Sequence, residues 1–348
     1  MVSLLTSIAH RAEQIVSSLG EMMKMSENMN VDWDKLSFIA QDALLKAPVK
    51  IDPFNNVMVS ISGGSDSDIV IDLLTKSVKD LSKLHFVFFD TGLEYQATKD
   101  HLIYLEDKYG VQIEKLHPKK PLPICTREFG EPFISKHVSY EMNVLQNNGF
   151  DWRDDTYENL IKEYSCIGAL KWWCNYYYEG SHFNIKRNKW LKEFIIANPP
   201  TFRISNKCCQ YVKKNPASDY KKEHDIDLNV TGMRKAEGGV RATRYKSCFD
   251  LKEDGISEYR PIWWLKDEDK ESYKAACGVV NSDCYTKYGL KRTGCAGCPL
   301  GRNFEDELNV IKEFEPKLYK AVNNVFGNSY EYTRKYREFV KEMNAHDN

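Results

Sequence analysis

The chain has 348 residues, a formal net charge of -1 and 42% hydrophobic residues, enough for one large domain or a domain with sizeable appendages. No apolar stretch reaches the roughly 18 residues that a membrane-spanning helix needs, and no basic segment precedes the first short apolar run, which excludes the pattern of an export signal. The ten cysteines are therefore expected to be reduced thiols of a soluble, cytoplasmic protein. In that setting, clustered cysteines are more often metal sites than disulfides.

The first part of the chain has a helical pattern. Apolar residues recur at helical spacing within residues 8–16 and again within 36–44, so residues 1–50 are predicted to form a helical N-terminal extension. From Asn56 onward the pattern becomes strand, turn, helix, strand. The apolar runs Val57–Ile61 and His85–Phe89 predict two buried strands, and Ser67–Lys79 predicts an amphipathic helix between them.

The same alternation continues downstream. A helix is predicted over Gln96–Tyr109, a strand over Val111–Leu116, and a further strand near Asp227–Gly232. Strands that alternate with helices predict an α/β fold with a doubly wound parallel sheet. Ligands of such sheets lie at the carboxyl ends of the strands, where a glycine-rich turn after Ile61 and the sequence Asp90-Thr91-Gly92 both fall.

Two later segments have a different character. Residues 138–200 are rich in tryptophan and tyrosine, and we interpret them as an inserted, mostly helical lobe within a domain that spans residues 51–303. Its aromatic residues are expected to serve as core and lid, and a base-stacking platform is the alternative. Residues 304–348 carry apolar residues at helical spacing and are predicted to form C-terminal helices.

Positive charge is concentrated between Lys186 and Lys222. This segment holds ten Lys or Arg residues against two acids, Glu193 and Asp219, which leaves a local charge of +8. One interpretation is a solvated face that is compensated elsewhere in the fold. The other is a surface for a polyanion such as a nucleic acid or a bound nucleotide.

The glycine-rich turn reads Ser62-Gly63-Gly64-Ser65-Asp66-Ser67. A turn that leads from a strand into a helix presents backbone N–H groups beside the positive end of the helix, which suits a phosphate or pyrophosphate. The serine hydroxyls can add donors, and the Asp66 carboxylate can hold a metal ion or a ribose hydroxyl. Taken alone, the turn is explained as well by an ordinary N-cap. It is not a Walker loop, because no Gly-Lys-Ser/Thr follows.

Further segments in a fixed order accompany this turn. They are Asp90-Thr91-Gly92-Leu93-Glu94-Tyr95, Cys208-Cys209 with Lys213-Lys214 and Pro216, Thr231-Gly232-Met233-Arg234 with Glu237 and Arg241, Arg260-Pro261-Ile262-Trp263-Trp264, and Arg292-Thr293-Gly294-Cys295. Together, over roughly residues 50–305, they resemble the PP-loop ATP pyrophosphatase superfamily, and within it the adenylyl-sulfate and phosphoadenylyl-sulfate (PAPS) reductase family. The resemblance implies an adenine nucleotide alpha hydrolase-like fold.

The resemblance also implies a nucleotide site for ATP, adenylyl-sulfate or PAPS. Its residues would be Ser62, Gly63, Gly64, Ser65, Asp66, Ser67, Asp90, Thr91, Gly92, Arg234 and Arg241. A guanidinium suits the two arginines' task because it grips phosphate or sulfate in a bidentate manner. Sulfur-transferring members usually have Lys where this chain has Ser65. The compensating cation could be Lys119, Lys120, Arg244 or Mg²⁺.

Four cysteines are candidate ligands of a metal or cluster. Cys295-Ala296-Gly297-Cys298 is a common half-site for zinc or iron–sulfur, and Cys208-Cys209 would supply the other half. Their order resembles that of 4Fe–4S-binding adenylyl-sulfate reductases and of the cluster-bearing sulfur-transfer enzyme of DNA phosphorothioation, which implies a 4Fe–4S cluster. Zinc and unligated structural thiols remain the alternatives.

The reaction depends on whether a nucleophilic cysteine is present. A sulfonucleotide reductase of this family carries one in a C-terminal Glu-Cys-Gly-hydrophobic-His tail, whereas no cysteine follows Cys298 here. Cys248 could replace it if Lys246 and Arg244 lower its pKa, although a semi-buried structural thiol is the simpler interpretation. The predicted catalytic residues are accordingly Asp66, Arg234, Arg241 and Cys248.

We therefore expect a nucleotide-dependent sulfurtransferase that adenylates an acceptor, either a nucleic acid or a small metabolite. Its partners would be an adenine nucleotide and a sulfur donor such as a cysteine desulfurase. The first alternative is a reductase that releases sulfite from adenylyl-sulfate or PAPS, with a thioredoxin-like reductant or glutathione. The second alternative is a non-catalytic nucleotide- or redox-sensing module.

Overall fold

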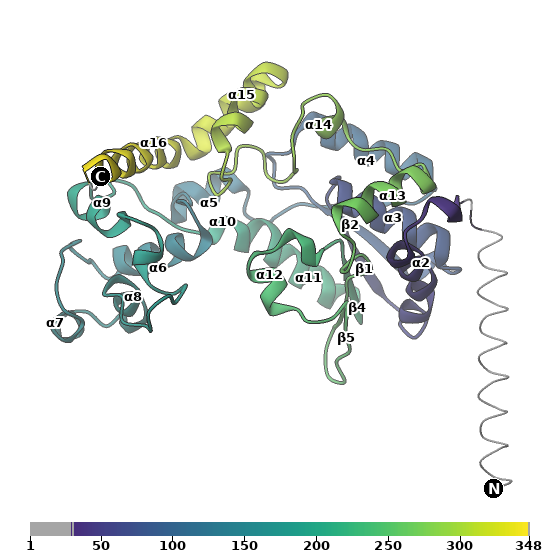
Figure 1. Cartoon of the computed structure of the whole chain (residues 1–348), viewed down its shortest axis with the longest axis horizontal. Helices are drawn as coiled ribbons and strands as arrows, with labels where there is room; N and C mark the ends of the chain where they lie inside the picture. Colours follow the sequence, from purple (N-terminus) through teal and green to yellow (C-terminus); the bar gives the residue numbers. More distant parts are fainter. Residues whose placement is uncertain (1–28, 30, 347–348) are drawn as a thin grey trace, which may run out of the picture. The chain divides into compact units, whose positions relative to one another are not determined.

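The computed structural model describes residue 29 and residues 31–346, apart from the side chains of residues 240 and 241. This part of the chain forms two compact units (Figure 1). Unit 1 comprises the described residues up to Phe88 together with Ala97–Leu116 and Ser218–Thr293, and unit 2 comprises Phe89–Gln96, His117–Ala217 and the described residues from Gly294 onward. The helix predicted within residues 8–16 lies outside the described residues.

Unit 1 is built on one sheet of six strands. Their order is β3(Ile113–Leu116)-β2(Leu84–Phe89)-β1(Val57–Ile61)-β4(Leu228–Thr231)-β6(Ser257–Tyr259)-β5(Phe249–Asp250). Strand β1 runs parallel to β2 and β4, and β4 runs parallel to β6, whereas β5 is antiparallel to β6. The α/β fold with a mainly parallel sheet is thus confirmed, and the short β5–β6 pair is an addition that the sequence did not predict.

Helices cover both faces of this sheet. Helices α2(Phe38–Ile51), α3(Ser65–Ser77), α4(Gln96–Tyr109) and α13(Asp267–Cys277) contribute to one apolar core with the strands, in which Phe86 and Phe88 of β2 take part. The preceding residue, His85, contacts Tyr220 of α11(Asn215–Glu223) instead, with a separation of 3.3 Å between its Nδ1 and the tyrosine hydroxyl. Because successive residues of a strand point to opposite faces, α11 covers the second face.

Shorter elements complete unit 1. They are η1(Trp33–Lys35), η2(Leu81–Lys83), η5(Lys235–Glu237), α12(Gly239–Arg244) and α14(Asp283–Thr286).

Unit 2 is helical. Its elements are α5(Leu122–Phe129), α6(Lys136–Asn147), α7(Tyr157–Glu163), α8(Ile167–Trp173), η3(Ile185–Arg187), α9(Leu191–Ala197), α10(Lys207–Cys209), the π-helical turn η4(Gln210–Lys214), α15(Phe304–Phe314) and α16(Pro316–His346). Tyr332 of α16 packs against Phe133 and Phe194, with ring centroids 4.8 and 4.9 Å apart. The aromatic segment and the C-terminal helix therefore share one core. Among the described residues, no helix is both long and apolar enough to cross a membrane.

Candidate functional site

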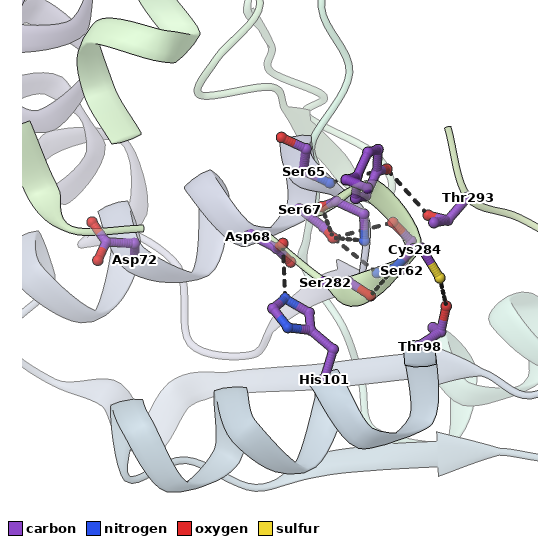
Figure 2. Close-up of polar contacts among 12 residues, drawn as sticks. Ser62, Ser65, Ser67, Asp68, Asp72, Thr98, His101, Ser282, Cys284 and Thr293 are labelled. Carbon is purple, nitrogen blue, oxygen red and sulfur yellow. Dashed lines mark hydrogen bonds and ion pairs between the residues drawn. The ribbon is translucent and has the colours of Figure 1, made fainter. Parts of the chain in front are cut away.

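The glycine-rich turn joins the carboxyl end of β1 to the first turn of α3, and Ser67 holds its shape (Figure 2). The Ser67 hydroxyl donates to the Gly64 carbonyl at 2.8 Å and accepts from the backbone N–H groups of Ser62 and Gly64 at 3.2 and 3.1 Å. This bonding commits the Ser67 hydroxyl to the turn itself, so its predicted contact with a phosphate stays a prediction. The backbone at Gly63 is left-handed, with φ +63°.

The side chain of Ser65 is buried at the start of α3, and its Oγ has no hydrogen-bond partner. A buried hydroxyl without a partner is costly unless another group satisfies it. The Ser65 backbone N–H donates to the Tyr285 hydroxyl at 3.3 Å. Because backbone N–H groups at a helix N-terminus favour anions, this end of α3 is the best candidate phosphate site in unit 1.

The last residues of unit 1 in sequence, which include Tyr285 and Thr293, lie over the turn. A Cβ atom at Gly64 would lie 2.8 Å from Thr293 Oγ1 and 3.1 Å from the Tyr285 hydroxyl. Glycine is therefore required here by close approach rather than by backbone strain, because Gly64 has an ordinary φ of -103°. The motif Arg292-Thr293-Gly294-Cys295 thus begins beside the turn, which Figure 2 shows for Thr293.

Charged residues form a network around Asp66. Its Oδ1 lies 3.1 Å from Nε of Arg234 and 2.7 Å from Nζ of Lys270 on α13. Arg234 is buried, and its other guanidinium nitrogens bond to Asp267 and to the Leu265 carbonyl. Arg234 therefore positions Asp66 in this structure, and its predicted phosphate contact stays a prediction. Lys270 supplies the positive charge that Ser65 does not, and the sequence did not indicate it.

Below the turn, a buried pair supports α3. Asp68 Oδ2 lies 2.9 Å from His101 Nε2 on α4, and Asp68 Oδ1 is buried without a partner (Figure 2). Burial raises the pKa of Asp68, and the hydrogen bond from His101 opposes that effect. On the other side, a Cβ at Gly232 would lie 3.1 Å from the Asp66 carbonyl. The glycine of Thr231-Gly232-Met233-Arg234 thus lets β4 approach the start of α3.

Three further residues singled out in the sequence belong to unit 1: Cys248, Arg241 and Arg260. The carbonyl of Cys248 accepts from the Arg260 N–H at 2.7 Å, which places Cys248 beside the carboxyl end of β6. Arg241 is on α12, and its side chain lies outside the described part. Arg260 is fully buried, pairs with Asp250 and Glu258, and stacks on the Tyr245 ring at 3.7 Å.

In unit 2, Glu94 closes the Asp90-Thr91-Gly92 turn. It accepts from the Thr91 N–H at 3.0 Å, the Thr91 hydroxyl at 2.6 Å and the Gly92 N–H at 3.0 Å. Burial, together with the neighbouring Asp90, raises the pKa of Glu94 to about 7. The carbonyl of the intervening Leu93 accepts from the Ala296 N–H at 2.7 Å, so this turn adjoins the Cys295–Cys298 loop.

The four candidate ligand cysteines all belong to unit 2. Cys208 and Cys209 lie on α10, and the π-helical turn η4 follows them; such turns are frequent at functional sites. Cys295 and Cys298 flank Gly297, whose N–H donates to Glu307 Oε1 at 3.1 Å and whose carbonyl accepts from the Tyr330 hydroxyl. Two helices of unit 2 thus hold the second pair in place.

The charges of these thiols are interdependent. A hydrogen bond from Cys208 lowers the pKa of Cys209 to about 6, against the effect of burial and with help from Lys136 and Lys213. The same bond and burial raise the pKa of Cys208. Burial and the nearby Cys295 raise that of Cys298 to about 12.

The donor set suits thiophilic iron. Even so, within residues 31–346 no three His, Cys, Asp or Glu side chains are grouped so as to hold a metal ion. Cluster and Mg²⁺ binding therefore stay predictions.

The basic segment Lys186–Lys222 is divided between the two units. It crosses from unit 2 into unit 1 near Ser218. Lys213 is turned toward thiols. Burial acts to lower the pKa of Lys213, but the thiols Cys295 and Cys209 outweigh burial, so the pKa is raised. Lys192 pairs with Asp154. Part of the positive charge is therefore compensated within the fold.

The sheet and the turn define an α/β protein with a glycine-rich turn at the carboxyl end of β1, and a known family model matches part of the chain. Residues 56–172 match the phosphoadenosine phosphosulfate reductase domain, which confirms the predicted family resemblance for that part of the chain.

Among individual proteins, the chain is 26% identical over 273 residues to the uncharacterized protein MJ0066 of Methanocaldococcus jannaschii, a match that covers 77% of this chain and 41% of that protein. The chain spans less than half the length of the curated relatives it matches.

Two solved structures are similar at low identity. PAPS reductase from Candida auris in a phosphate complex has a TM-score of 0.41 and 15% identity, over 74% of this chain and 87% of that one. The U34-tRNA thiolase NcsA from Methanococcus maripaludis with its [4Fe-4S] cluster has a TM-score of 0.37 and 13% identity, over 87% and 78%. At these values neither likeness assigns an activity or a cofactor to this chain.

Proposed function

We propose that unit 1 binds the phosphates of an adenine nucleotide at the start of α3. The observation that carries this proposal is the buried Ser65 hydroxyl at the N-terminus of α3, which has no hydrogen-bond partner. The backbone N–H of Ser65 contacts only the side-chain hydroxyl of Tyr285. A phosphate oxygen would satisfy both groups. Lys270, on α13 beside Asp66, would offset part of the phosphate charge.

We further propose that the bound nucleotide is ATP and that the reaction is sulfur transfer. An acceptor oxygen would attack the α-phosphorus, the α–β bridging bond would break, and pyrophosphate would leave against the helix N-terminus. Sulfide would then form a bond to the acceptor carbon, and AMP would depart with the former acceptor oxygen. The residues at the turn would act by stabilising charge on the leaving group, which is usually the largest catalytic contribution.

The sulfur source would be held in unit 2. The four thiols Cys208, Cys209, Cys295 and Cys298 are the groups that would bind a 4Fe–4S cluster, and Lys136 and Lys213 would balance their charge. Such a cluster, when bound, supplies iron with affinity for sulfide. Iron and acid-labile sulfide in protein purified without oxygen would support this assignment, and stoichiometric zinc in a colourless protein would refute it.

Nucleotide binding can be tested separately from turnover. We expect Lys270→Met to weaken ATP binding about tenfold in isothermal titration calorimetry, because a hydrogen bond to a charged group contributes about 1.5 kcal/mol or more. Lys274→Met is the matched control, since Lys274 lies one turn along α13 and pairs with Glu271 at 2.7 Å. Equal losses in the two variants, or no ATP binding by the unaltered protein, would contradict the proposed site.

A reductase remains the second candidate because of Cys248. This half-buried thiol lies beside the carboxyl end of β6, in the same sheet as the candidate phosphate turn. Attack of its sulfur on the sulfate sulfur of a sulfonucleotide would break the bond to the phosphate oxygen, release the nucleotide and leave an S-sulfonate on Cys248. A thioredoxin-like dithiol would then free sulfite and restore the thiol while it is itself oxidised to a disulfide. Loss of sulfite release in Cys248→Ser would favour this reaction over sulfur transfer.

A further inference from the structure

The segment between α8 and α9 is a loop held in shape from within. Asn184 is 1% exposed, and its Oδ1 accepts from the Tyr177 N–H at 3.1 Å. Its Nδ2 donates to the Tyr177 and Tyr178 carbonyls at 3.1 and 3.2 Å. At the start of the loop, Asn175 has a left-handed backbone, with φ 54°, and its Oδ1 accepts from the Lys186 N–H at 2.9 Å. These bonds fix one conformation before any partner binds.

This loop presents aromatic rings to solvent. Tyr178 is 77% exposed and Phe183 is 57% exposed, and Tyr176 and Tyr177 are exposed as well. The preceding Trp172 and Trp173, by contrast, are fully buried in the core. The aromatic segment thus divides into a core part and an outward part. Neighbouring exposed aromatic rings on a fixed loop are typical of a binding surface.

The same loop carries several cations. Lys186 and Arg187 are exposed on η3. A cavity of about 300 Å³ is lined by Lys186, Lys189, Lys192 and Trp190, with Glu193 as its one acid. Lys192 pairs with Asp154, and Lys186 lies 3.8 Å from the exposed Glu179. Residues 175–192 nevertheless carry four Lys or Arg against one acid, which leaves a net charge of +3.

We propose that this aromatic loop, defined as residues 175–192, binds a single-stranded nucleic acid. Exposed rings stack on unpaired bases, and adjacent cations contact the backbone phosphates. A duplex hides its bases, so it could use the cations but not the rings. An acidic protein could contact the cations, but it has no bases to stack on the rings. The binding itself is independent of catalysis, whereas a role for this strand as the acceptor rests on the function proposed above.

Fluorescence anisotropy with a labelled 12-nucleotide single-stranded RNA, the matching DNA and the blunt duplex would test this proposal on the full chain at about 0.1 M salt. We expect the double variant Tyr178→Ala, Phe183→Ala to weaken single-strand binding at least tenfold. The double variant Lys186→Ala, Arg187→Ala should weaken both single-strand and duplex binding and flatten their salt dependence. Thermal unfolding of each variant checks that it folds.

Matched controls lie in the same unit. Tyr140 on α6 is 54% exposed, so Tyr140→Ala removes an exposed ring outside the loop. Lys317 and Lys320 are exposed on α16, so their replacement by Ala removes two charges elsewhere. Both controls should retain single-strand binding.

Three outcomes would overturn the proposal: no single-strand binding, equal losses in loop and control variants, or duplex binding that is preferred and insensitive to Tyr178→Ala, Phe183→Ala. The result is separable from the proposed function. If the loop variants lose binding but no pyrophosphate is ever released, the nucleic-acid surface is supported and the proposed sulfur transfer is refuted. If pyrophosphate is released while single strands do not bind, only the proposed nucleic-acid surface is refuted.

Discussion

Replacement of Gly63 by alanine tests how tightly the glycine-rich turn is built. Gly63 has a φ of +63°, and an added Cβ would lie 2.9 Å from Thr98 Cγ2. The left-handed backbone costs an alanine about 1–2 kcal/mol, and overpacking typically costs about 1–3 kcal/mol more. We therefore expect Gly63→Ala to lower the free energy of unfolding by about 2–5 kcal/mol.

Two companion variants separate these contributions. Gly110 has nearly the same φ, +62°, with nothing within 4 Å of an added Cβ, so Gly110→Ala should cost only the backbone part. Thr98→Ser removes the clashing methyl group but keeps the hydroxyl that contacts Cys284 at 3.4 Å. In the double variant Gly63→Ala, Thr98→Ser, about 1–3 kcal/mol should be recovered.

Urea unfolding, followed by circular dichroism, measures these differences. The four proteins compared are the unaltered protein, Gly63→Ala, Gly110→Ala and the double variant Gly63→Ala, Thr98→Ser. The reasoning about the turn would be refuted if Gly63→Ala were no more destabilising than Gly110→Ala. It would also be refuted if Thr98→Ser gave no recovery.

Two further predictions concern single hydroxyl and carboxyl groups. Tyr285→Phe should bind ATP about fivefold more tightly in calorimetry, because the tyrosine hydroxyl now occupies the Ser65 N–H that a phosphate would use, and one such bond contributes about 1 kcal/mol; weaker binding would contradict this. Tyr109→Phe is its control, since that hydroxyl bonds to Asp72 instead. Burial raises the pKa of Glu141 from 4.5 to about 7, so the unaltered protein should lose stability as pH rises through that interval. Its neighbour His137, 3.5 Å away, offers little charge there because burial lowers the pKa of His137. Glu141→Gln should therefore stabilise the protein at pH 8, by up to about 3 kcal/mol, and much less at pH 4.5; equal effects at both pH values in urea unfolding would contradict this.

The parts of the fold with a strong local pattern could be predicted. Continuous apolar runs identified β1 and β2, and helical spacing identified α4 with its observed bounds, Gln96–Tyr109. Helix α3 begins at Ser65, two residues before the predicted start, because Gly64 rather than a serine is its N-cap. Strands β5 and β6 were missed because two or three residues carry no periodicity.

The candidate site was only partly predictable for a related reason. The glycine-rich turn is local in sequence, so its residues could be named. Lys270 and Tyr285 lie more than two hundred residues away, and only the packing of α13 and α14 brings them to the turn. Glu94 lay within a recognised motif, but its three hydrogen bonds depend on the folded turn. Such contacts cannot be predicted from the spacing of residues in the sequence or from its composition.

We propose that ATP is cleaved between its α- and β-phosphates at the start of α3. The most direct test of this proposal is an assay of pyrophosphate and sulfite with protein purified without oxygen. ATP, adenylyl-sulfate and PAPS would each be supplied with sulfide and with single-stranded RNA, DNA or small-molecule acceptors. We expect pyrophosphate to be released from ATP, this release to be lost in Gly63→Ala but not in Gly110→Ala, and no sulfite to form. Sulfite from either sulfonucleotide, with no pyrophosphate from ATP, would contradict it.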